Sequence, residues 1–216
     1  MTKLKAGLII FDLDGTLVDS SRDIAWSANM TLKSMGYDER GLEAIKEHVG
    51  WGVRSLLEKL MPREGAERIE EARLKFLEFY SSHLTVDTHI YPGVKETLSF
   101  FNSKGKKMAV VTNKPEGLSG RVLAELNLSG YFQMLVGGDS YPNKKPHPEP
   151  VEKVLSALGS GPAIIVGDSP TDCEAGKGAG IRAIGVSYGF RPKEELERAG
   201  FDLIVGRFTE LKEVIE

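Results

Sequence analysis

Four aspartates stand in two short clusters of the sequence, and their spacing permits joint chemistry. Asp12 and Asp14 flank a single leucine directly after one apolar run, and Asp168 and Asp172 follow another apolar run far along the chain. A carboxylate can act as a nucleophile, as a general acid or base, or as an oxygen ligand of Mg²⁺. Carboxylates brought together repel one another and raise their pKa values unless a cation lies between them. We therefore expect Mg²⁺ where Asp12, Asp14 and Asp168 meet.

Groups suited to binding an anion follow two further apolar runs. Thr112 and Asn113 come directly after the first of these, and Lys145 lies in the loop Asn143-Lys144-Lys145-Pro146-His147-Pro148 after the second. The lysine ammonium is a compact positive charge suited to phosphate oxygens, and the hydroxyl and amide add hydrogen-bond donors. Together with Mg²⁺, these groups predict a cradle for a phosphate group.

Short, fully apolar runs predict the strands that position these side chains. They cover residues 8–11, 108–111, 134–136, 163–166 and 183–186. Runs of this kind are typical of a parallel sheet covered on both faces. Apolar residues at helical spacing separate the runs, which predicts an α/β protein with a doubly wound, Rossmann-like core. Ligands of such sheets bind outside the carboxyl ends of the strands, so we expect the polar clusters to face one crevice.

The segment between about residues 20 and 84 breaks this alternation, because its apolar residues recur at helical spacing. Residues 42–49 and 53–60 are interpreted as two of its helices, and Ser20 and Ser21 are candidate N-caps of the first. We predict an inserted α-helical cap over residues 19–85. The catalytic core then consists of residues 1–18 and 86–216.

The composition excludes several classes of protein. Of the 216 residues, 41% are hydrophobic and 27% are charged, which is ordinary for a globular protein. The net charge of −3 argues against nucleic-acid binding. The apolar run at 7–11 is too short for a signal core or a membrane span. The single cysteine, Cys173, favours a reducing compartment. We expect a cytoplasmic protein whose partner is a small metabolite, with no nucleic acid and no membrane.

Four segments, taken in order, resemble the motifs of the haloacid dehalogenase superfamily. They are Asp-Leu-Asp-Gly-Thr-Leu-Val-Asp at 12–19, Val-Thr-Asn-Lys-Pro at 111–115, Lys-Pro-His-Pro at 145–148 and Gly-Asp-Ser-Pro-Thr-Asp at 167–172. The resemblance covers nearly the whole chain, including the helical segment after the first motif. It implies a phosphatase that hydrolyses small phosphate monoesters through an aspartyl phosphate.

The resemblance also implies a role for each motif residue. Asp12 would be the nucleophile, and Asp14 would protonate the leaving alkoxide and then activate water. Mg²⁺ would be held by Asp12, the backbone carbonyl of Asp14 and Asp168. Asp172 would orient Lys145 or a metal-bound water. The groups that stabilise the transferring phosphoryl oxygens would be Thr112, Asn113 and Lys145. Dehalogenases and ion pumps of the superfamily lack an acid at the position of Asp14, which favours phosphate-ester hydrolysis or phosphomutation.

The predicted cap carries a short loop, Val49-Gly50-Trp51-Gly52-Val53-Arg54, between two helices. It resembles the specificity loop of phosphoglycolate phosphatases, which implies 2-phosphoglycolate as the substrate. The substrate-binding residues of this loop would be Gly50, Trp51, Gly52 and Arg54. Arg54 would pair with the substrate carboxylate, or else it lies on a solvent-exposed helix face. Trp51 contacts substrate or core, or packs within the cap.

Three other functions stay open at this point. A β-phosphoglucomutase-like isomerase would use the same core and type of cap, and an inorganic pyrophosphatase would use the same core. A non-catalytic binding module would show no Mg²⁺-dependent turnover of any phosphate ester. The presence of every reactive residue argues against the last.

Overall fold

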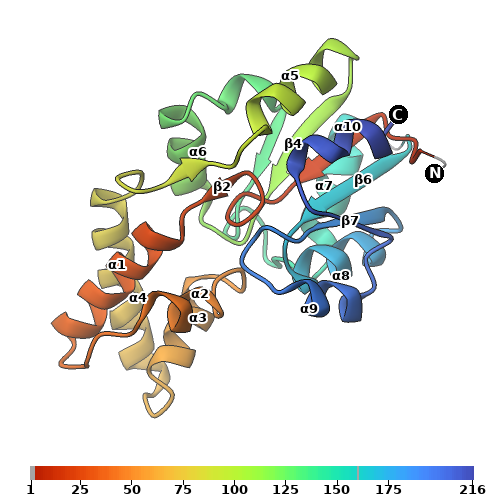
Figure 1. Ribbon diagram of the computed structural model, residues 1–216. Coiled ribbons are helices and arrows are strands. Elements are labelled where there is room, and N and C mark those ends of the chain that lie inside the picture. Colours follow the sequence, from red (N-terminus) through yellow and green to blue (C-terminus); the bar gives the residue numbers. More distant parts are fainter. Residues whose placement is uncertain (1–2, 160) are drawn as a thin grey trace.

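The computed structural model describes residues 3–159 and 161–216, which form a sheet-centred core and a group of four helices beside it (Figure 1). The core sheet has six parallel strands in the order β5-β4-β1-β6-β7-β8. Their bounds are β1 Leu8–Phe11, β4 Lys107–Val111, β5 Met134–Val136, β6 Ala163–Gly167, β7 Arg182–Val186 and β8 Leu203–Val205. The chain therefore leaves β1 toward one edge and later returns to its other side, so β1 stands at the point where the strand order reverses.

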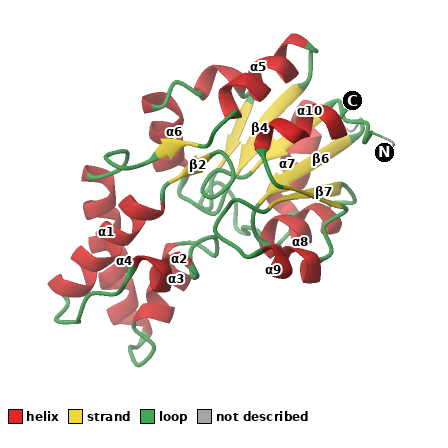
Figure 2. Ribbon diagram, in the orientation of Figure 1, coloured by secondary structure: helices red, strands yellow, loops and turns green. Residues whose placement is uncertain are grey.

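Helices cover both faces of this sheet (Figure 2). They are α5 Val94–Ser103, α6 Glu116–Glu125, α7 Glu149–Leu158, α8 Pro170–Gly178, α9 Lys193–Ala199 and α10 Leu211–Val214, with 3₁₀ turns η1 Ser129–Tyr131 and η2 Phe208–Glu210. Successive strand side chains point to opposite faces. In β1, Ile9 and Phe11 accordingly join one buried cluster, whereas Leu8 and Ile10 join the other. The doubly wound α/β prediction is confirmed.

Three strands were missed by the sequence prediction. The edge strand β8 has three residues, and two of them are only partly buried, so it forms no long apolar run. The other two, β2 Val18–Asp19 and β3 His89–Ile90, have two residues each and pair antiparallel with one another. They are the two chain segments that enter and leave the helical group.

The helical group lies between β2 and β3 and contains α1 Ser21–Ser34, α2 Leu42–Lys46, α3 Val53–Leu60 and α4 Ala66–Ser82. All four helices fall inside the segment 19–85. The second helix ends at Lys46, three residues earlier than predicted, and residues 47–49 form a turn toward the core. We call residues 47–52 the cap loop.

The start of α1 differs from the predicted capping. Ser20 stands at the N-cap position, but its hydroxyl donates to Asp14 Oδ1 at 2.6 Å and makes no capping bond. The carboxylate of Asp19 accepts from the Ser21 backbone N–H at 3.0 Å instead. The helix start is therefore bonded by Asp19, one residue before the predicted caps, because the Ser20 hydroxyl is engaged by Asp14.

Asp23, on the first turn of α1, ties the entering and leaving segments together. Its fully buried carboxylate accepts from the backbone N–H groups of Asp87 at 3.0 Å and Thr88 at 2.8 Å. The Thr88 hydroxyl donates to the same carboxylate at 2.6 Å. Hydrogen bonds from several donors offset the cost of burying this carboxylate. The contact therefore fixes how the helical group is attached to the core.

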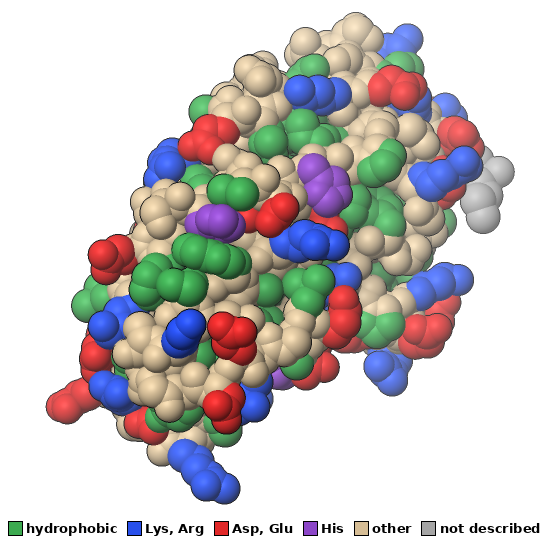
Figure 3. All heavy atoms as spheres, turned by 60° about the vertical axis from the view of Figure 1, so that its left-hand side comes forward, with side chains coloured by type: hydrophobic (Ala, Val, Ile, Leu, Met, Phe, Trp, Pro, Cys, Tyr) green, Lys and Arg blue, Asp and Glu red, His purple; other side chains and the backbone are tan. Residues whose placement is uncertain are grey.

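Two surface features bear on the predicted partners. On the face shown in Figure 3, positive and negative side chains are interspersed, with no large block of one sign. Within the described part of the chain, every helix is too short or too polar to cross a bilayer.

Candidate active site

The carboxyl ends of β1, β4 and β6 bring the predicted residues together. Asp12 directly follows β1, Thr112 follows β4, and Asp168 follows β6. The pairing of the strands continues one residue beyond β1, since the Asp12 N–H donates to the Val166 carbonyl at 2.9 Å. All three side chains are buried. The point of strand-order reversal therefore holds two carboxylates and a hydroxyl in fixed positions, as expected for a ligand site of such a sheet.

Lys145 links two of the aspartates. Its Nζ lies 2.9 Å from Asp12 Oδ1, 2.6 Å from Asp172 Oδ1 and 2.6 Å from the Val111 carbonyl. The lysine is 1% exposed, so its charge is balanced by these partners and not by water. Burial alone would lower the pKa of Lys145, but the two carboxylates raise it above its usual range. Lys145 is therefore a fixed positive charge beside Asp12.

Asp172 is fully engaged by other groups. One oxygen accepts from Lys145, and the other accepts from the N–H of Ser169 at 3.1 Å and from its hydroxyl at 3.0 Å. The serine and the aspartate form a capping box at the start of α8. Oxygens of Asp12, Asp168 and Asp172 lie within 4.8 Å of one another. Asp172 is held between Lys145 and Ser169, whereas Asp12 and Asp168 follow the adjacent strands β1 and β6.

Burial governs the charge of these two carboxylates. It raises the pKa of Asp12 to about 7, with the Lys145 ammonium opposing the shift and Asp172 adding to it. Burial also raises the pKa of Asp168 well above its usual range, and the charges of Asp12 and Asp172 add to the effect. A divalent cation between Asp12 and Asp168 would restore the ionised forms. The donor set thus fits Mg²⁺, which binds few protein carboxylates and retains water.

Two glycines allow the backbone to approach Asp168 closely. A Cβ atom at Gly15, where φ is +86°, would lie 2.1 Å from Asp168 Oδ2, and one at Gly189 would lie 2.4 Å from Asp168 Cβ. The same carboxylate accepts from the Phe190 N–H at 2.7 Å and from the Thr16 hydroxyl at 3.3 Å. Any larger residue at either glycine would displace Asp168.

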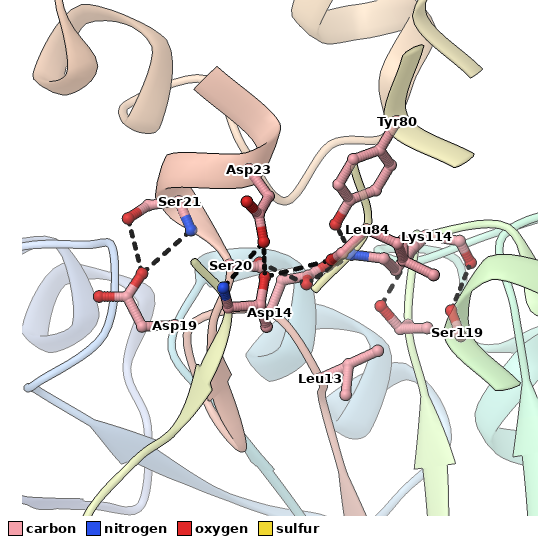
Figure 4. Close-up of polar contacts among 12 residues, drawn as sticks. Leu13, Asp14, Asp19, Ser20, Ser21, Asp23, Tyr80, Leu84, Lys114 and Ser119 are labelled. Carbon is pink, nitrogen blue, oxygen red and sulfur yellow. Dashed lines mark hydrogen bonds and ion pairs between the residues drawn. The ribbon is translucent and has the colours of Figure 1, made fainter. Parts of the chain in front are cut away.

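Asp14 has different neighbours, because its side chain points toward the helical group (Figure 4). Its carboxylate accepts from Ser20 and from Lys114 Nζ, which lies 2.8 Å from Oδ1. Lys114 also donates to the hydroxyl of Tyr80 on α4, and its Nζ lies 4.5 Å from the centre of that ring. Burial lowers the pKa of Lys114, but Asp14 and Tyr80 raise it above its usual range. Sequence reasoning assigned no role to Lys114 or Tyr80; the lysine's place directly after Thr112 and Asn113 was the available signal.

A small cavity of about 50 Å³ lies between core and helical group. The core contributes Asp12, Asp14, Thr112, Asn113, Lys114 and Pro115, and the helical group contributes Ile24, Val49, Gly50, Gly52, Val53, Leu56, Phe76 and Tyr80. One wall is thus polar and charged, whereas the other is almost wholly apolar. The cavity has room only for a small ligand.

Asn113 joins three parts of this site. Its Nδ2 donates to the carbonyl of Gly50 in the cap loop and to the carbonyl of Lys145, both at 2.8 Å. Its Oδ1 is buried and accepts no hydrogen bond from the described residues. The Asn113 side chain therefore borders the cavity while holding the cap loop against the core.

Three predicted substrate-binding residues do not line the cavity: Lys145, which is buried beside Asp12, and the loop residues Arg54 and Trp51. Arg54 Nε bonds Glu58 Oε1 at 3.0 Å, and both side chains are half exposed. Val53 and Leu56 line the cavity, and a residue one position after Val53 is rotated by about 100° around the helix axis. Arg54 consequently faces solvent, which matches its interpretation as an exposed helix residue. Trp51 is 37% exposed and lines an outer groove with Lys144.

Comparison with known proteins places these features in context. Residues 9–186 match the family profile described as haloacid dehalogenase-like hydrolase. A phosphoglycolate phosphatase of Aquifex aeolicus is 45% identical over 185 residues, covering 85% of each chain. One of Vibrio parahaemolyticus is 33% identical and covers 100% of this chain and 98% of its own. The crystal structure of a predicted phosphoglycolate phosphatase from Haemophilus somnus matches with a TM-score of 0.91 at 30% identity, covering 97% of both chains. The likeness therefore extends over the helical group as well as the core.

Proposed function

The chain belongs to the haloacid dehalogenase-like hydrolases and is a phosphatase of that family, and from this premise we propose a Mg²⁺-dependent reaction through an aspartyl phosphate on Asp12, with 2-phosphoglycolate as the substrate. The observation that carries the proposal is the position of Asp12. Its buried carboxylate ends the central strand, with the Lys145 ammonium 2.9 Å away and Asp168 on the adjacent strand. A nucleophile held in this way keeps a fixed direction of attack.

In the first step, an oxygen of Asp12 attacks phosphorus while the bond from phosphorus to the ester oxygen breaks. The leaving oxygen keeps the bonding electron pair and takes a proton from Asp14, which leaves an acyl phosphate on Asp12. In the second step, water attacks phosphorus and gives its proton to Asp14. The carboxylate of Asp12 and inorganic phosphate are released. Thr112, Asn113 and Lys145 would stabilise the phosphoryl oxygens in both steps.

Asp12 and Asp168, together with the backbone carbonyl of Asp14, would hold Mg²⁺. Bound there, the ion would offset the negative charge of the phosphate and of the two carboxylates. The support for this assignment is the raised pKa of both buried aspartates, because a bound cation would offset the effect of burial on their charged forms. Residues 1–18 and 86–216 would act as the catalytic core, and residues 19–85 as the cap that closes over it.

The small cavity and the names of the relatives support 2-phosphoglycolate. Among the described residues that line the cavity, Lys114 carries the only positive charge. When Asp14 holds a proton, Lys114 loses its carboxylate partner, and a substrate carboxylate would replace it. We therefore propose Lys114, in place of the exposed Arg54, as the partner of the substrate carboxylate.

The function is tested with purified protein and Mg²⁺ on 2-phosphoglycolate, ethyl phosphate, β-glucose 1-phosphate and pyrophosphate. We expect the highest kcat/KM on 2-phosphoglycolate, and we expect no turnover of any substrate without Mg²⁺. Isomerisation of the sugar phosphate, or preferred hydrolysis of pyrophosphate, would replace the proposal with one of the two alternatives. Absence of turnover on every ester would refute it.

The carboxylate contact is tested by comparing two substrates of similar size. Lys114→Gln should lower the ratio of kcat/KM for 2-phosphoglycolate to kcat/KM for ethyl phosphate by about 10- to 100-fold, as a hydrogen bond to a charged group is worth about 1.5–3 kcal/mol. Arg54→Ala should leave the ratio unchanged. The opposite pattern would return the role to Arg54 and require that the loop move on substrate binding.

A further inference from the structure

We propose that Arg191 is a positioning residue that holds the cap closed on the core, and that residues 188–191 connect this contact to Asp168. The inference rests on the proposed function, because it concerns the closed form in which the phosphate would be transferred. Arg191 lies in the loop between β7 and α9, which reaches toward α2 and the cap loop (Figure 1). None of the motifs in the sequence includes it.

The guanidinium of Arg191 bonds the cap through backbone carbonyls. Its Nη1 donates to the Glu47 carbonyl and its Nη2 to the Val49 carbonyl. Glu47 is the C-cap residue of α2, where the C=O groups have no partner within the helix, and Val49 lies in the turn that follows. A planar guanidinium presents two donors side by side and so binds both carbonyls at once. A lysine ammonium is a compact charge without this planar pair of donors, so it would not reproduce the paired geometry.

Burial makes this contact important for closure. Arg191 is 5% exposed, and the carboxylate of Glu195 lies 3.8 Å from its Nε. That Nε has no hydrogen-bond partner among the described residues. The charge is therefore stabilised chiefly by the two carbonyls of the cap. A buried charge is costly unless it is hydrogen-bonded. The Arg191 guanidinium therefore gains its full set of hydrogen-bond partners only when the cap is closed.

Two further core side chains bind the same loop in the same manner. Asn113 Nδ2 donates to the Gly50 carbonyl at 2.8 Å, and Lys144 Nζ donates to the Trp51 carbonyl at 2.7 Å. Gly52 leaves room for the lysine, since a Cβ atom there would lie 2.6 Å from Lys144 Nζ. The core thus holds the cap loop by its main chain, and Arg191 supplies two of these bonds.

The residues just before Arg191 contact the proposed metal side of the crevice. The Phe190 N–H donates to Asp168 Oδ2 at 2.7 Å, and Gly189 packs directly on the Asp168 side chain. The Tyr188 hydroxyl donates to the Thr16 carbonyl at 2.8 Å. A displacement of Arg191 on opening would be transmitted over one residue to the hydrogen bond that orients Asp168. Closure and the position of Asp168 are therefore coupled.

The first test measures amide hydrogen exchange in the full-length protein without substrate, in wild type, Arg191→Ala, Arg191→Lys and Lys193→Ala. Lys193 is the matched control, because it lies two residues away and makes an exposed pair with Glu197 at 3.4 Å. We expect exchange in peptides covering residues 42–57 to rise by about 10- to 100-fold in Arg191→Ala. The rise should be smaller in Arg191→Lys and absent in Lys193→Ala. Exchange of β1 and β6 should stay unchanged.

Equal acceleration in β1 and β6 would show that Arg191 only stabilises the fold, and unchanged exchange in residues 42–57 would also overturn the proposal.

The second test uses the best phosphate ester of the wild type. In Arg191→Ala a smaller fraction of the protein is closed, so KM should rise by about 10- to 100-fold relative to wild type. At saturating substrate kcat should change by less than about threefold. A fall in kcat at constant KM would contradict the positioning role. If wild type hydrolyses no ester, the proposed function fails, while the exchange result still decides the role of Arg191.

Discussion

The crevice and the contact between cap and core are built from different kinds of partner. In the crevice, side chains bind side chains, as where Lys145 lies between Asp12 and Asp172. At the cap loop, core side chains bind backbone carbonyls, as where Asn113 holds Gly50. The first arrangement demands particular residue types on both sides, whereas the second demands them on the core side alone. The crevice thus depends mainly on residue identity, and the contact with the cap loop depends mainly on backbone position.

The largest effect should come from removing the nucleophile. Asp12→Asn keeps the shape of the side chain but removes its charge and its nucleophilicity. The loss of covalent catalysis should lower kcat by about 10⁴-fold or more, measured on the best ester. Far-UV circular dichroism and hydrogen exchange of the cap loop should match wild type. Retention of more than about 1% of activity would remove Asp12 from the assigned role, since covalent catalysis contributes far more.

The next effect concerns stability within the crevice. Asp172→Ala leaves the buried Lys145 without one of its two carboxylate partners and removes the capping box of α8. Breaking a buried ion pair from one side costs about 3–5 kcal/mol, so chemical denaturation should show a loss of that size. Lys193→Ala, at an exposed pair, should change the free energy of unfolding by less than about 0.5 kcal/mol. Similar losses in both variants would erase the distinction between crevice and surface.

The raised pKa of Asp12 gives the crevice a pH dependence that the cap contact lacks. In metal-free protein the carboxyl favours its proton in the folded state, so its contribution to stability is present below its usual value of 3.8 and is lost as the pH rises through about 7. Mg²⁺ bound at Asp12, as proposed, would have to displace that proton. Its apparent affinity, measured by calorimetry, should therefore be about 30-fold or more weaker at pH 5.5 than at pH 8. Equal affinities would mean that Asp12 is ionised without the ion.

A smaller effect is expected where cap and core meet through side chains. Tyr80→Phe removes the hydroxyl that accepts from Lys114 but keeps the ring beneath its charge. One hydrogen bond is worth about 0.5–1.5 kcal/mol, so kcat/KM should fall by about 2- to 10-fold. If Tyr80→Phe costs as much as Arg191→Ala, side-chain contacts would matter to closure as much as the carbonyl contacts do.

The smallest effect is expected at Arg54. Its pair with Glu58 is half exposed, and such pairs contribute about 0–1 kcal/mol. Arg54→Ala should leave stability within about 0.5 kcal/mol of wild type and kcat/KM within about twofold. A larger change on 2-phosphoglycolate alone would show that the cap loop rearranges around substrate.

The difference between the two regions also explains what could be predicted from the sequence. Asp12, Thr112 and Asp168 could be placed together because each follows a fully apolar run, and such runs are typical of central parallel strands. The strand β8 could not, since Leu203 and Ile204 are only half buried. The position of Arg54 beside the loop suggested a role in the crevice, but on α3 its side chain faces solvent and pairs with Glu58.

Arg191 and Tyr80 could not be found in this way for a different reason. A side chain that bonds a backbone carbonyl has no complementary residue type elsewhere in the sequence to mark it. Tyr80 lies at helical spacing among apolar residues and reads as one more core position of α4, which its ring indeed occupies. Its hydroxyl meets Lys114 only because the cap folds back onto the core.

Recognition of the cap loop through carbonyls has a consequence for how caps can diversify. Asn113 and Lys144 bind the carbonyls of Gly50 and Trp51, and these oxygens persist under substitution wherever the loop keeps its path. The apolar side chains lining the cavity can therefore change without loss of the closing contacts. Substitutions at residues such as Leu56 or Phe76 would therefore reshape the cavity while leaving these carbonyl contacts in place, and a helical group grafted from a relative would have to supply the same carbonyls. The invariant part of such chimeras would be the course of the main chain from 47 to 52.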